Sequence, residues 1–269
     1  MSRLAGLLLP ALLGYALLTH AAGAAAPAPR IAIIIDDLGY GWAPGVRSAR
    51  LPGPVGCAVL PGTPHGARLA RLAHASGKQV MLHLPMQSLD DLEPAPGTFH
   101  LDTTRRQLAH RVAADLTAIP HVIGISNHRG SLLTRHPGHM AWLMEEIAAR
   151  DGLFFIDSYT TAASVALGIA RESGIPAARR DVFLDPDPDP ATVRREFDRL
   201  VALARRHGTG LGIGHPYPAT LALLEKELPR LGQLGIELVS PGELVRIRTS
   251  EASRSWPPSS YRLQTASKK

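Results

Sequence analysis

The stretch IAIIIDDLGY at residues 31–40 decides the fold class. It opens with five aliphatic residues, 31–35, which are apolar on both faces, as a strand buried inside a parallel sheet must be. Asp36 and Asp37 follow at once, and burying two adjacent carboxylates costs stability unless something neutralises them. The stretch therefore predicts a buried parallel strand that carries two acidic groups to a functional edge.

Seven further short apolar runs repeat this pattern along the chain, separated by segments with helical spacing. They lie at 55–60, 79–83, 122–126, 153–156, 182–184, 210–214 and 236–240. Strands that alternate with helices in this way indicate repeated βα units around a parallel sheet. Eight such units in about 220 residues predict an α/β fold, an irregular (β/α) barrel of seven or eight parallel strands.

Composition agrees with one large domain. The chain has 269 residues, of which 45% are hydrophobic, 19% charged and only 5% aromatic, so Ala, Leu, Ile and Val must build the core. The net charge is +6, but the basic residues form no run of five or more. Because a phosphate-binding surface needs clustered Lys and Arg, we expect no nucleic-acid partner.

The two ends differ in composition from the rest of the chain. Arg3 precedes the apolar run LAGLLLPALLGYALL, and small residues follow at 22–26. This pattern predicts a signal peptide at 1–24, cleaved near Ala24 or Ala26, and a linker at 25–30. An uncleaved membrane anchor is the alternative, although Pro10, Gly14 and His20 interrupt the run.

We therefore expect a periplasmic protein with no membrane span after cleavage. Residues 31–248 would form the barrel. Residues 249–269 are rich in Ser, Thr, Arg and Lys without periodicity, which predicts a disordered tail.

Polar side chains follow most of the expected strands. In a (β/α) barrel the chemistry lies at the carboxyl ends of the strands. The residues found there are Asp36, Asp37, His83, Asn127, His128, Asp157, Ser158, Asp185 and His215. Carboxylates and imidazoles that converge at one barrel mouth predict a metal-assisted or acid/base site.

A divalent cation would neutralise the aspartate pair. One carboxylate could bind the metal while its neighbour, pointing to the other side of the strand, stays free as a base. The alternative is that the pair caps a helix or forms an ion pair with an arginine. With His83 and His128, one aspartate would complete a plausible three-ligand zinc shell with an open position.

Six motifs, taken in order, resemble the divergent polysaccharide deacetylases, distant relatives of the NodB-like carbohydrate esterases. They are IAIIIDDLGY (31–40), LPGTPH (60–65), MLHLPMQ (81–87), GISNHRGSLLT (124–134), FFIDSYTT (154–161) and GIGHPYPATLALL (212–224). The resemblance spans residues 31 to about 245. It implies a NodB-like barrel that removes acetyl groups from an N- or O-acetylated cell-envelope glycan with Zn²⁺ or another divalent metal.

The resemblance also implies roles for individual residues. Asp36 would be the catalytic base, Asp37 a metal ligand and His215 the general acid. The NodB-like pattern takes both metal histidines from one H-[ST]-x-x-H loop, but here Gln87 stands four residues after His83. We therefore predict that His128 supplies the third ligand, because a neutral amide oxygen is a poor zinc ligand.

The remaining site predictions concern orientation and substrate. Asp157 would orient His215 or another catalytic side chain, or instead cap the following helix. Asn127 or Ser131 would hydrogen-bond the second ring nitrogen of His128. We expect Trp42, Asn127, Arg129 and Ser131 to contact the substrate, with Arg129 standing where the NodB-like R-x-P-Y motif has its arginine.

Two other functions remain open. A non-catalytic glycan-binding or regulatory envelope protein would keep the barrel and lose the chemistry. A metal-dependent hydrolase of another amide would keep the ligands and change the groove.

Overall fold

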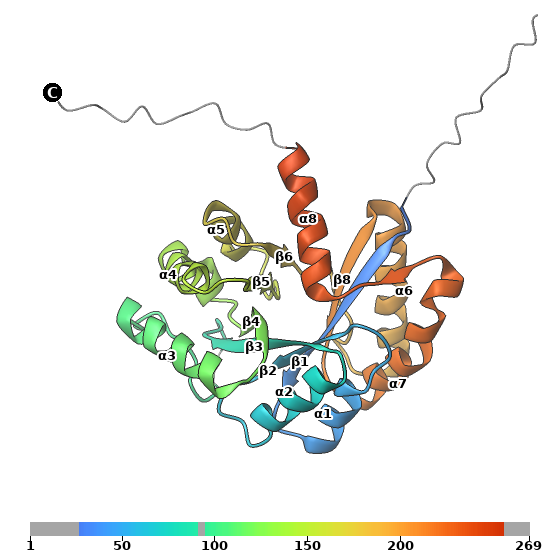
Figure 1. The fold of residues 1–269 in the computed structure, drawn as a ribbon, viewed down its shortest axis with the longest axis horizontal. Coiled ribbons are helices and arrows are strands. Elements are labelled where there is room, and N and C mark those ends of the chain that lie inside the picture. The colour runs from blue at the N-terminus through green and yellow to red at the C-terminus, as the bar shows by residue number, and fades with distance from the viewer. Residues whose placement is uncertain (1–26, 91–94, 256–269) are drawn as a thin grey trace, which may run out of the picture.

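A parallel sheet, curved into an open barrel, forms the centre of the molecule (Figure 1). The computed structural model describes residues 27–90 and 95–255, so the expected signal peptide and the end of the tail lie outside the described residues. The eight-strand path runs β6-β5-β4-β3-β2-β1-β8-β7, and β9 pairs with the start of β1. All pairs are parallel, which confirms the predicted fold class. The strands are β1 (Arg30–Leu38), β2 (Gly56–Val59), β3 (Gln79–Met86), β4 (Val122–Arg129), β5 (Phe154–Asp157), β6 (Ala177–Arg179), β7 (Val182–Phe183), β8 (Thr209–Gly214) and β9 (Glu237–Leu238).

Helices connect the strands and cover the outside of the sheet (Figure 1). Local signals fix where several begin: Thr104 closes a capping box with Gln107 at the start of α3, and Asp189 caps α6 ahead of Pro190. In the described ranges no helix is long and apolar enough to cross a membrane. The helices are α1 (Trp42–Ala49), α2 (Gly66–Ala75), α3 (Arg105–Ala118), α4 (Pro137–Ala148), α5 (Ala166–Glu172), α6 (Pro190–His207), α7 (Pro218–Glu227) and α8 (Pro241–Ser255).

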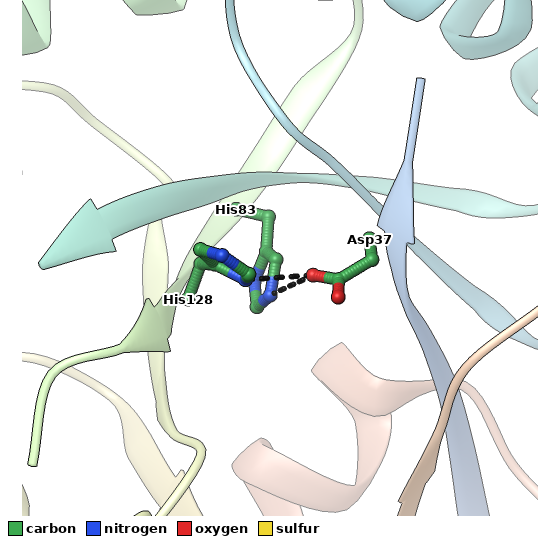
Figure 2. Close-up of side chains that lie close together, drawn as sticks. All are labelled: Asp37, His83 and His128. Carbon is green, nitrogen blue, oxygen red and sulfur yellow. Dashed lines mark ion pairs between the residues drawn. The ribbon is translucent and has the colours of Figure 1, made fainter. Parts of the chain in front are cut away.

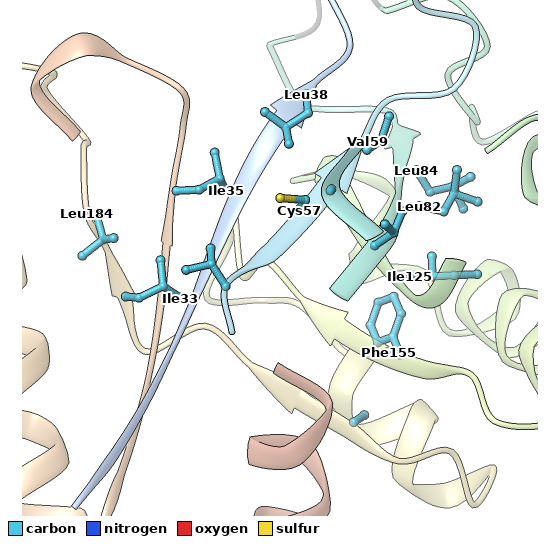
Figure 3. Close-up of a cluster of buried hydrophobic side chains, with 14 of the residues drawn as sticks. Ile33, Ile35, Leu38, Cys57, Val59, Leu82, Leu84, Ile125, Phe155 and Leu184 are labelled. Carbon is cyan, nitrogen blue, oxygen red and sulfur yellow. The ribbon is translucent and has the colours of Figure 1, made fainter. Parts of the chain in front are cut away.

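The side chains on the two faces of the sheet form two separate apolar clusters. On the outer face, alternate strand residues such as Ile33, Ile35 and Leu82 pack against the surrounding helices (Figure 3). On the inner face, Ala32, Ile34, Met81 and Ile213 pack with Leu244 and Val245 from the start of α8. The apolar runs are therefore buried on both sides, as predicted, and the last helix fills one end of the barrel.

The barrel does not close by strand pairing. Strands β6 and β7 are consecutive in the chain but lie at opposite ends of the eight-strand path. Helix α8 contacts β1, β6 and β8. Its Arg248 donates hydrogen bonds to the Arg179 carbonyl and to Thr209 Oγ1, both at 3.2 Å, and pairs with Asp181. Helix α8 thus joins the two edges of the sheet where no strand does.

Two details of the sequence prediction are wrong. Strand β6 was not predicted, because its three residues are too short to show a pattern. The tail was expected from Thr249, but α8 continues through Ser255. The segment 250–255 contains Glu251, Ala252 and Arg254, which favour helix, so the helix extends past Ile247, its last large aliphatic residue.

Candidate active site

A bulge at the end of β1 brings both aspartates into one site. Ile35 pairs with Cys57 and Leu38 with Val59, so β1 has one more residue than β2 over this interval. The extra residue is accommodated by Asp37, whose φ is +59°. Regular alternation would put the two carboxylates on opposite faces, as the sequence predicted. The bulge overturns that detail, since Asp36 and Asp37 line the same cavity.

Asp37, His83 and His128 converge from β1, β3 and β4 (Figure 2). Asp37 Oδ1 lies 2.7 Å from Nδ1 of His128 and 3.1 Å from Nε2 of His83. One potential ligand atom from each residue lies within 4.8 Å of the other two. The neighbouring strands β3 and β4 pair through this region, which places the two imidazoles side by side.

The donor set fits a metal ion. Asp37 Oδ1 is buried and forms no hydrogen bond with any described residue, although two ring nitrogens lie within 3.1 Å. His83 is held by a hydrogen bond between its Nδ1 and Ser126 Oγ at 2.8 Å, which leaves Nε2 directed at Asp37. Burial raises the pKa of Asp37, but His128 and His83 outweigh it, so the pKa of Asp37 is lowered. One carboxylate and two imidazoles are a ligand set that zinc accepts.

Asp36 occupies a different environment although it is adjacent in the chain. Its side chain is buried, and its Oδ1 has no hydrogen-bond partner among the described residues. Burial raises the pKa of Asp36, and the opposing influence of His83 and His215 does not fully offset it. The Arg180 guanidinium lines the same cavity and donates hydrogen bonds to the carbonyls of Ser158 (2.5 Å) and Tyr159 (3.0 Å). Asp36 Oδ2 lies 3.5 Å from His83 Nε2, so Asp36 keeps one unpartnered oxygen, Oδ1, in the cavity that Arg180 also lines.

His215 is oriented by Asp185. The ring Nδ1 lies 2.9 Å from Asp185 Oδ1, while the other carboxylate oxygen accepts hydrogen bonds from the His215 backbone N–H and from Thr220 Oγ1, each at 2.7 Å. His215 Nε2 therefore faces the site, 3.6 Å from Asp37 Oδ2. Burial lowers the pKa of His215, but Asp185, Asp37 and Asp36 outweigh it and raise the pKa to about 8.

Asp157 does not orient His215. Its two carboxylate oxygens accept hydrogen bonds from the Tyr159 backbone N–H and from Ser164 Oγ, both at 2.8 Å. Asp157 therefore fixes the turn after β5 and caps no helix, because α5 begins only at Ala166 with Val165 at its N-cap. Asp185 takes the orienting position.

The cavity has a volume of about 280 Å³. Of the four predicted substrate contacts, Asn127 and Arg129 line it, whereas Ser131 lines an adjoining hollow. Trp42 lines neither. It packs edge-on against His65 and lies under the Arg68 guanidinium, 3.9 Å from the ring centre, so one ring face is already covered.

The predicted outer-sphere contacts to His128 are also absent from the described hydrogen bonds. Asn127 instead accepts from the Ser158 N–H and donates to the Arg129 carbonyl, both at 2.8 Å. Ser131 Oγ accepts from the Leu89 N–H at 3.0 Å. These two side chains tie loops together, and Gln87 does likewise, since its Oε1 accepts from the Leu101 N–H at 2.9 Å.

Arg180, Asp185 and Ser126 are the site residues to which sequence reasoning gave no role. Asp185 follows an expected strand, so its position was a usable signal. Arg180 follows the unpredicted strand β6, and Ser126 lies within the apolar run of β4, so neither gave a signal.

A parallel barrel that gathers carboxylates and imidazoles at the carboxyl ends of its strands is typical of metal-assisted acid/base sites. Residues 33–245 match the family model described as divergent polysaccharide deacetylase. The chain belongs to this family, which confirms the resemblance seen in the sequence.

Similar proteins support the family and the fold. An uncharacterized protein of Haemophilus influenzae is 35% identical over 217 residues, which cover 81% of this chain and 77% of that protein. The uncharacterized protein YibQ of Escherichia coli is 33% identical over 231 residues, covering 86% and 71%. The crystal structure of an uncharacterized protein from Agrobacterium tumefaciens C58 superposes with a TM-score of 0.77 at 25% identity, covering 82% of this chain and 90% of that chain.

Proposed function

We propose that this protein is a divalent-metal-dependent deacetylase that removes acetyl groups from an N- or O-acetylated polysaccharide of the cell envelope. The observation that carries the proposal is the division of labour within one cavity. Asp37, His83 and His128 form a ligand set, while Asp36 and the Asp185-held His215 lie beside it, outside the set, where they can serve as base and acid. Membership of the deacetylase family agrees with this chemistry.

Asp37, His83 and His128 would hold the metal. A bound Zn²⁺ supplies a Lewis acid that lowers the pKa of water towards about 7 and stabilises negative charge on a carbonyl oxygen.

Asp36 and His215 move the protons. Asp36 Oδ1, which has no hydrogen-bond partner in the part of the chain that the structure describes, accepts a proton from the attacking water, whose oxygen bonds to the acetyl carbon. His215 Nε2 then donates a proton to the sugar nitrogen or oxygen as its bond to the acetyl carbon breaks and acetate leaves. Asp185 keeps Nδ1 occupied, so the proton is transferred from Nε2.

Arg180 stabilises the ionised form of Asp36. Its guanidinium is fixed by two backbone carbonyls and faces the same cavity. A fixed positive charge favours the carboxylate over the carboxylic acid, and only the carboxylate can act as a base.

The test combines metal content with acetate release. Wild-type protein loaded with Zn²⁺ should release acetate from N-acetylated oligosaccharides, and Asp36→Asn should bind the metal equally while losing activity by about 10²-fold or more. Loss of metal in Asp36→Asn would contradict its assignment as base. Glycan binding without acetate release would favour a non-catalytic glycan-binding protein, and hydrolysis of another amide would favour a metal-dependent amidase.

We also propose that the protein is exported to the periplasm. The support is the composition of residues 1–26, with Arg3 ahead of an apolar run and small residues. Sequencing the amino terminus of protein from the periplasmic fraction should give a start after residue 24 or 26. A start at Met1 would contradict cleavage.

A further inference from the structure

Ser158 brings a buried hydroxyl group to the metal cavity, and the proposed reaction does not use it. Three buried polar atoms of the cavity residues have no hydrogen-bond partner in the described part of the chain: Asp36 Oδ1, Asp37 Oδ1 and Ser158 Oγ. The first two belong to the proposed base and to a proposed metal ligand. A buried hydroxyl without a partner costs free energy, so the third atom favours a bound molecule that supplies the missing hydrogen bond.

The alternation of side chains along the strands directs Ser158 into the barrel. Side chains two residues apart on a strand share a face. Five cavity residues each follow an apolar residue of the inner cluster by two positions, so they form one polar layer next to that cluster. They are Asp36 after Ile34, His83 after Met81, Ser158 after Ile156, Arg180 after Ala178 and His215 after Ile213. Ser158 therefore shares a layer with the proposed base, the proposed acid and a proposed metal ligand.

The backbone of Ser158 is fixed on both sides. Its N–H donates to Asn127 Oδ1 at 2.8 Å, and its carbonyl accepts from Arg180 Nε at 2.5 Å. Among the described residues, the hydroxyl is thus the polar group of Ser158 that is left for a ligand. Because its position is set in advance, binding through it costs little conformational entropy.

The chemistry of the layer indicates which ligand group the hydroxyl meets. An acetamido group carries an N–H donor as well as a carbonyl acceptor, whereas an O-acetyl ester carries acceptors only. The N–H needs an acceptor, but Asp36 Oδ1 has to take the proton of the attacking water, and Asn127 Oδ1 already accepts from the Ser158 N–H. Ser158 Oγ, which has two acceptor lone pairs and no partner in the described chain, remains.

We propose that Ser158 Oγ accepts a hydrogen bond from the amide N–H of an acetamido sugar and so makes the protein select acetamides over O-acetyl esters. This inference rests on the proposed deacetylase function, which leaves the two kinds of substrate open. A site that pairs with a substrate N–H discriminates against an analogue that lacks it, because the polar group of the site then stays unpaired.

The first arm of the test measures one substitution on two substrates. With Zn²⁺ loaded, Ser158→Ala should lower kcat/KM on the tetramer of N-acetylglucosamine by about tenfold more than on O-acetylated xylotetraose. Each value is compared with that of wild type on the same substrate, so differences between the two sugars cancel. Ser164→Ala is the matched control, because Ser164 Oγ donates to Asp157 Oδ2 at 2.8 Å and does not line the cavity. It should change both values equally.

Thermal unfolding separates a binding role of Ser158 from a structural one. Ser158→Ala removes a hydroxyl that has no partner among the described residues, so the melting temperature should not fall. Ser164→Ala breaks the hydrogen bond to Asp157 and should lower it. Loss of activity without loss of stability is expected of a residue that serves function.

The second arm measures binding without turnover. Asp36→Asn protein loaded with Zn²⁺ should bind the N-acetylglucosamine tetramer in a calorimetric titration, and adding Ser158→Ala should weaken this binding by about tenfold. The same addition should weaken the binding of O-acetylated xylotetraose less.

The two proposals fail separately. If wild-type protein releases no acetate from either sugar but binds the acetamido sugar through Ser158, the deacetylase proposal fails and the contact stands. An equal loss on both substrates overturns the assignment of Ser158 to the amide N–H, and so does no loss on either. A melting temperature that falls in Ser158→Ala as it does in Ser164→Ala would make Ser158 structural. Absence of both turnover and binding overturns both proposals.

Discussion

Asp36 and Asp37 are adjacent in the chain, yet their surroundings push their pKa values in opposite directions. Burial raises the pKa of both, but only Asp37 lies close enough to two imidazoles for the net shift to be downward. Asp37, whose pKa is lowered, suits a metal ligand, and Asp36, whose pKa is raised, suits a base that accepts a proton. A single bulge residue creates this difference, because Asp37 rotates towards His128 while Asp36 keeps the inward direction of the strand.

Variants of His128, His83 and Gln87 test which side chains hold the metal. His128→Ala should weaken Zn²⁺ binding at least as much as His83→Ala, because both rings face the same oxygen of Asp37. Gln87→Ala should leave Zn²⁺ affinity nearly unchanged, since its side chain bonds the Leu101 N–H. Calorimetric titration of the three variants measures this, and full affinity in His128→Ala would move that residue from ligand to substrate contact.

Asp185 and Asp157 provide a matched pair of buried carboxylates. Asp185→Asn should lower kcat by about 10² to 10⁴-fold, because it disturbs the orientation and tautomer of His215, without changing Zn²⁺ affinity. Asp157→Asn should lower the melting temperature through the turn after β5 and leave kcat little changed. Steady-state kinetics gives kcat and thermal unfolding gives the melting temperature of the two variants. A comparable fall in kcat for both would restore Asp157 to a catalytic role.

Most of the ligand-bearing positions could be predicted from the sequence, because parallel strands bring the residues that follow them to one edge. Asp36, Asp37, His83, His128 and His215 are brought together in this way. Hydrogen-bond partners could not be predicted, since they depend on rotamers and on loops. Asp185 and Asp157 each follow a strand, and only the folded positions of β7 and β8 show which one reaches His215.

At the scale of elements, the turn after β1 depends on one glycine. Gly39 has φ of +137°, and a Cβ there would lie 2.0 Å from Thr63 Oγ1. Its carbonyl also accepts a hydrogen bond from the His65 N–H at 2.9 Å, so the turn is joined to the segment after β2. The position therefore excludes a side chain on grounds of both conformation and space.

Gly39→Ala should destabilise the protein by about 1–3 kcal/mol or more, because strain and overlap add. Gly168→Ala is the matched control, because Gly168 lies in α5 with open space around it. This substitution should stabilise the protein by about 0.5–1 kcal/mol, since alanine has the higher helix propensity. Urea denaturation should show a lower free energy of unfolding than wild type for Gly39→Ala and a higher one for Gly168→Ala. Equal stability of Gly39→Ala and wild type would show that the turn can rearrange.

Elements were predicted well where they are long and poorly where tertiary contacts alone define them. The aliphatic run of β1 and the Asp189-Pro190 start of α6 are visible in the sequence. Strand β6 has three residues and exists because β5 offers it a pairing edge. No local pattern carries that information.

At the scale of the whole molecule, Arg248 is the side chain that joins the edges of the open barrel. It is 17% exposed and reaches Asp181, the Arg179 carbonyl and Thr209. Arg248→Ala should cost about 1–3 kcal/mol, because it removes three hydrogen bonds from a charged donor, to Asp181, the Arg179 carbonyl and Thr209. Arg105→Ala, which removes an exposed pair with Glu145, should cost about 0.5 kcal/mol or less. Chemical denaturation measures the free energy of unfolding of both variants. An equal loss in the two would show that α8 is held by its apolar contacts alone.

The unpaired edges also determine where the barrel opens. The strands in the middle of the sheet pair with a neighbour on both sides, whereas in the described chain β6 and β7 each pair with one strand. Deuterium should therefore enter the amides of 177–183 ahead of those of β1. Arg180 lies in this segment and faces the metal cavity. A ligand that binds beside Asp36 should slow hydrogen–deuterium exchange at these amides. Their exchange rate can therefore be used to screen for substrates without measuring any reaction.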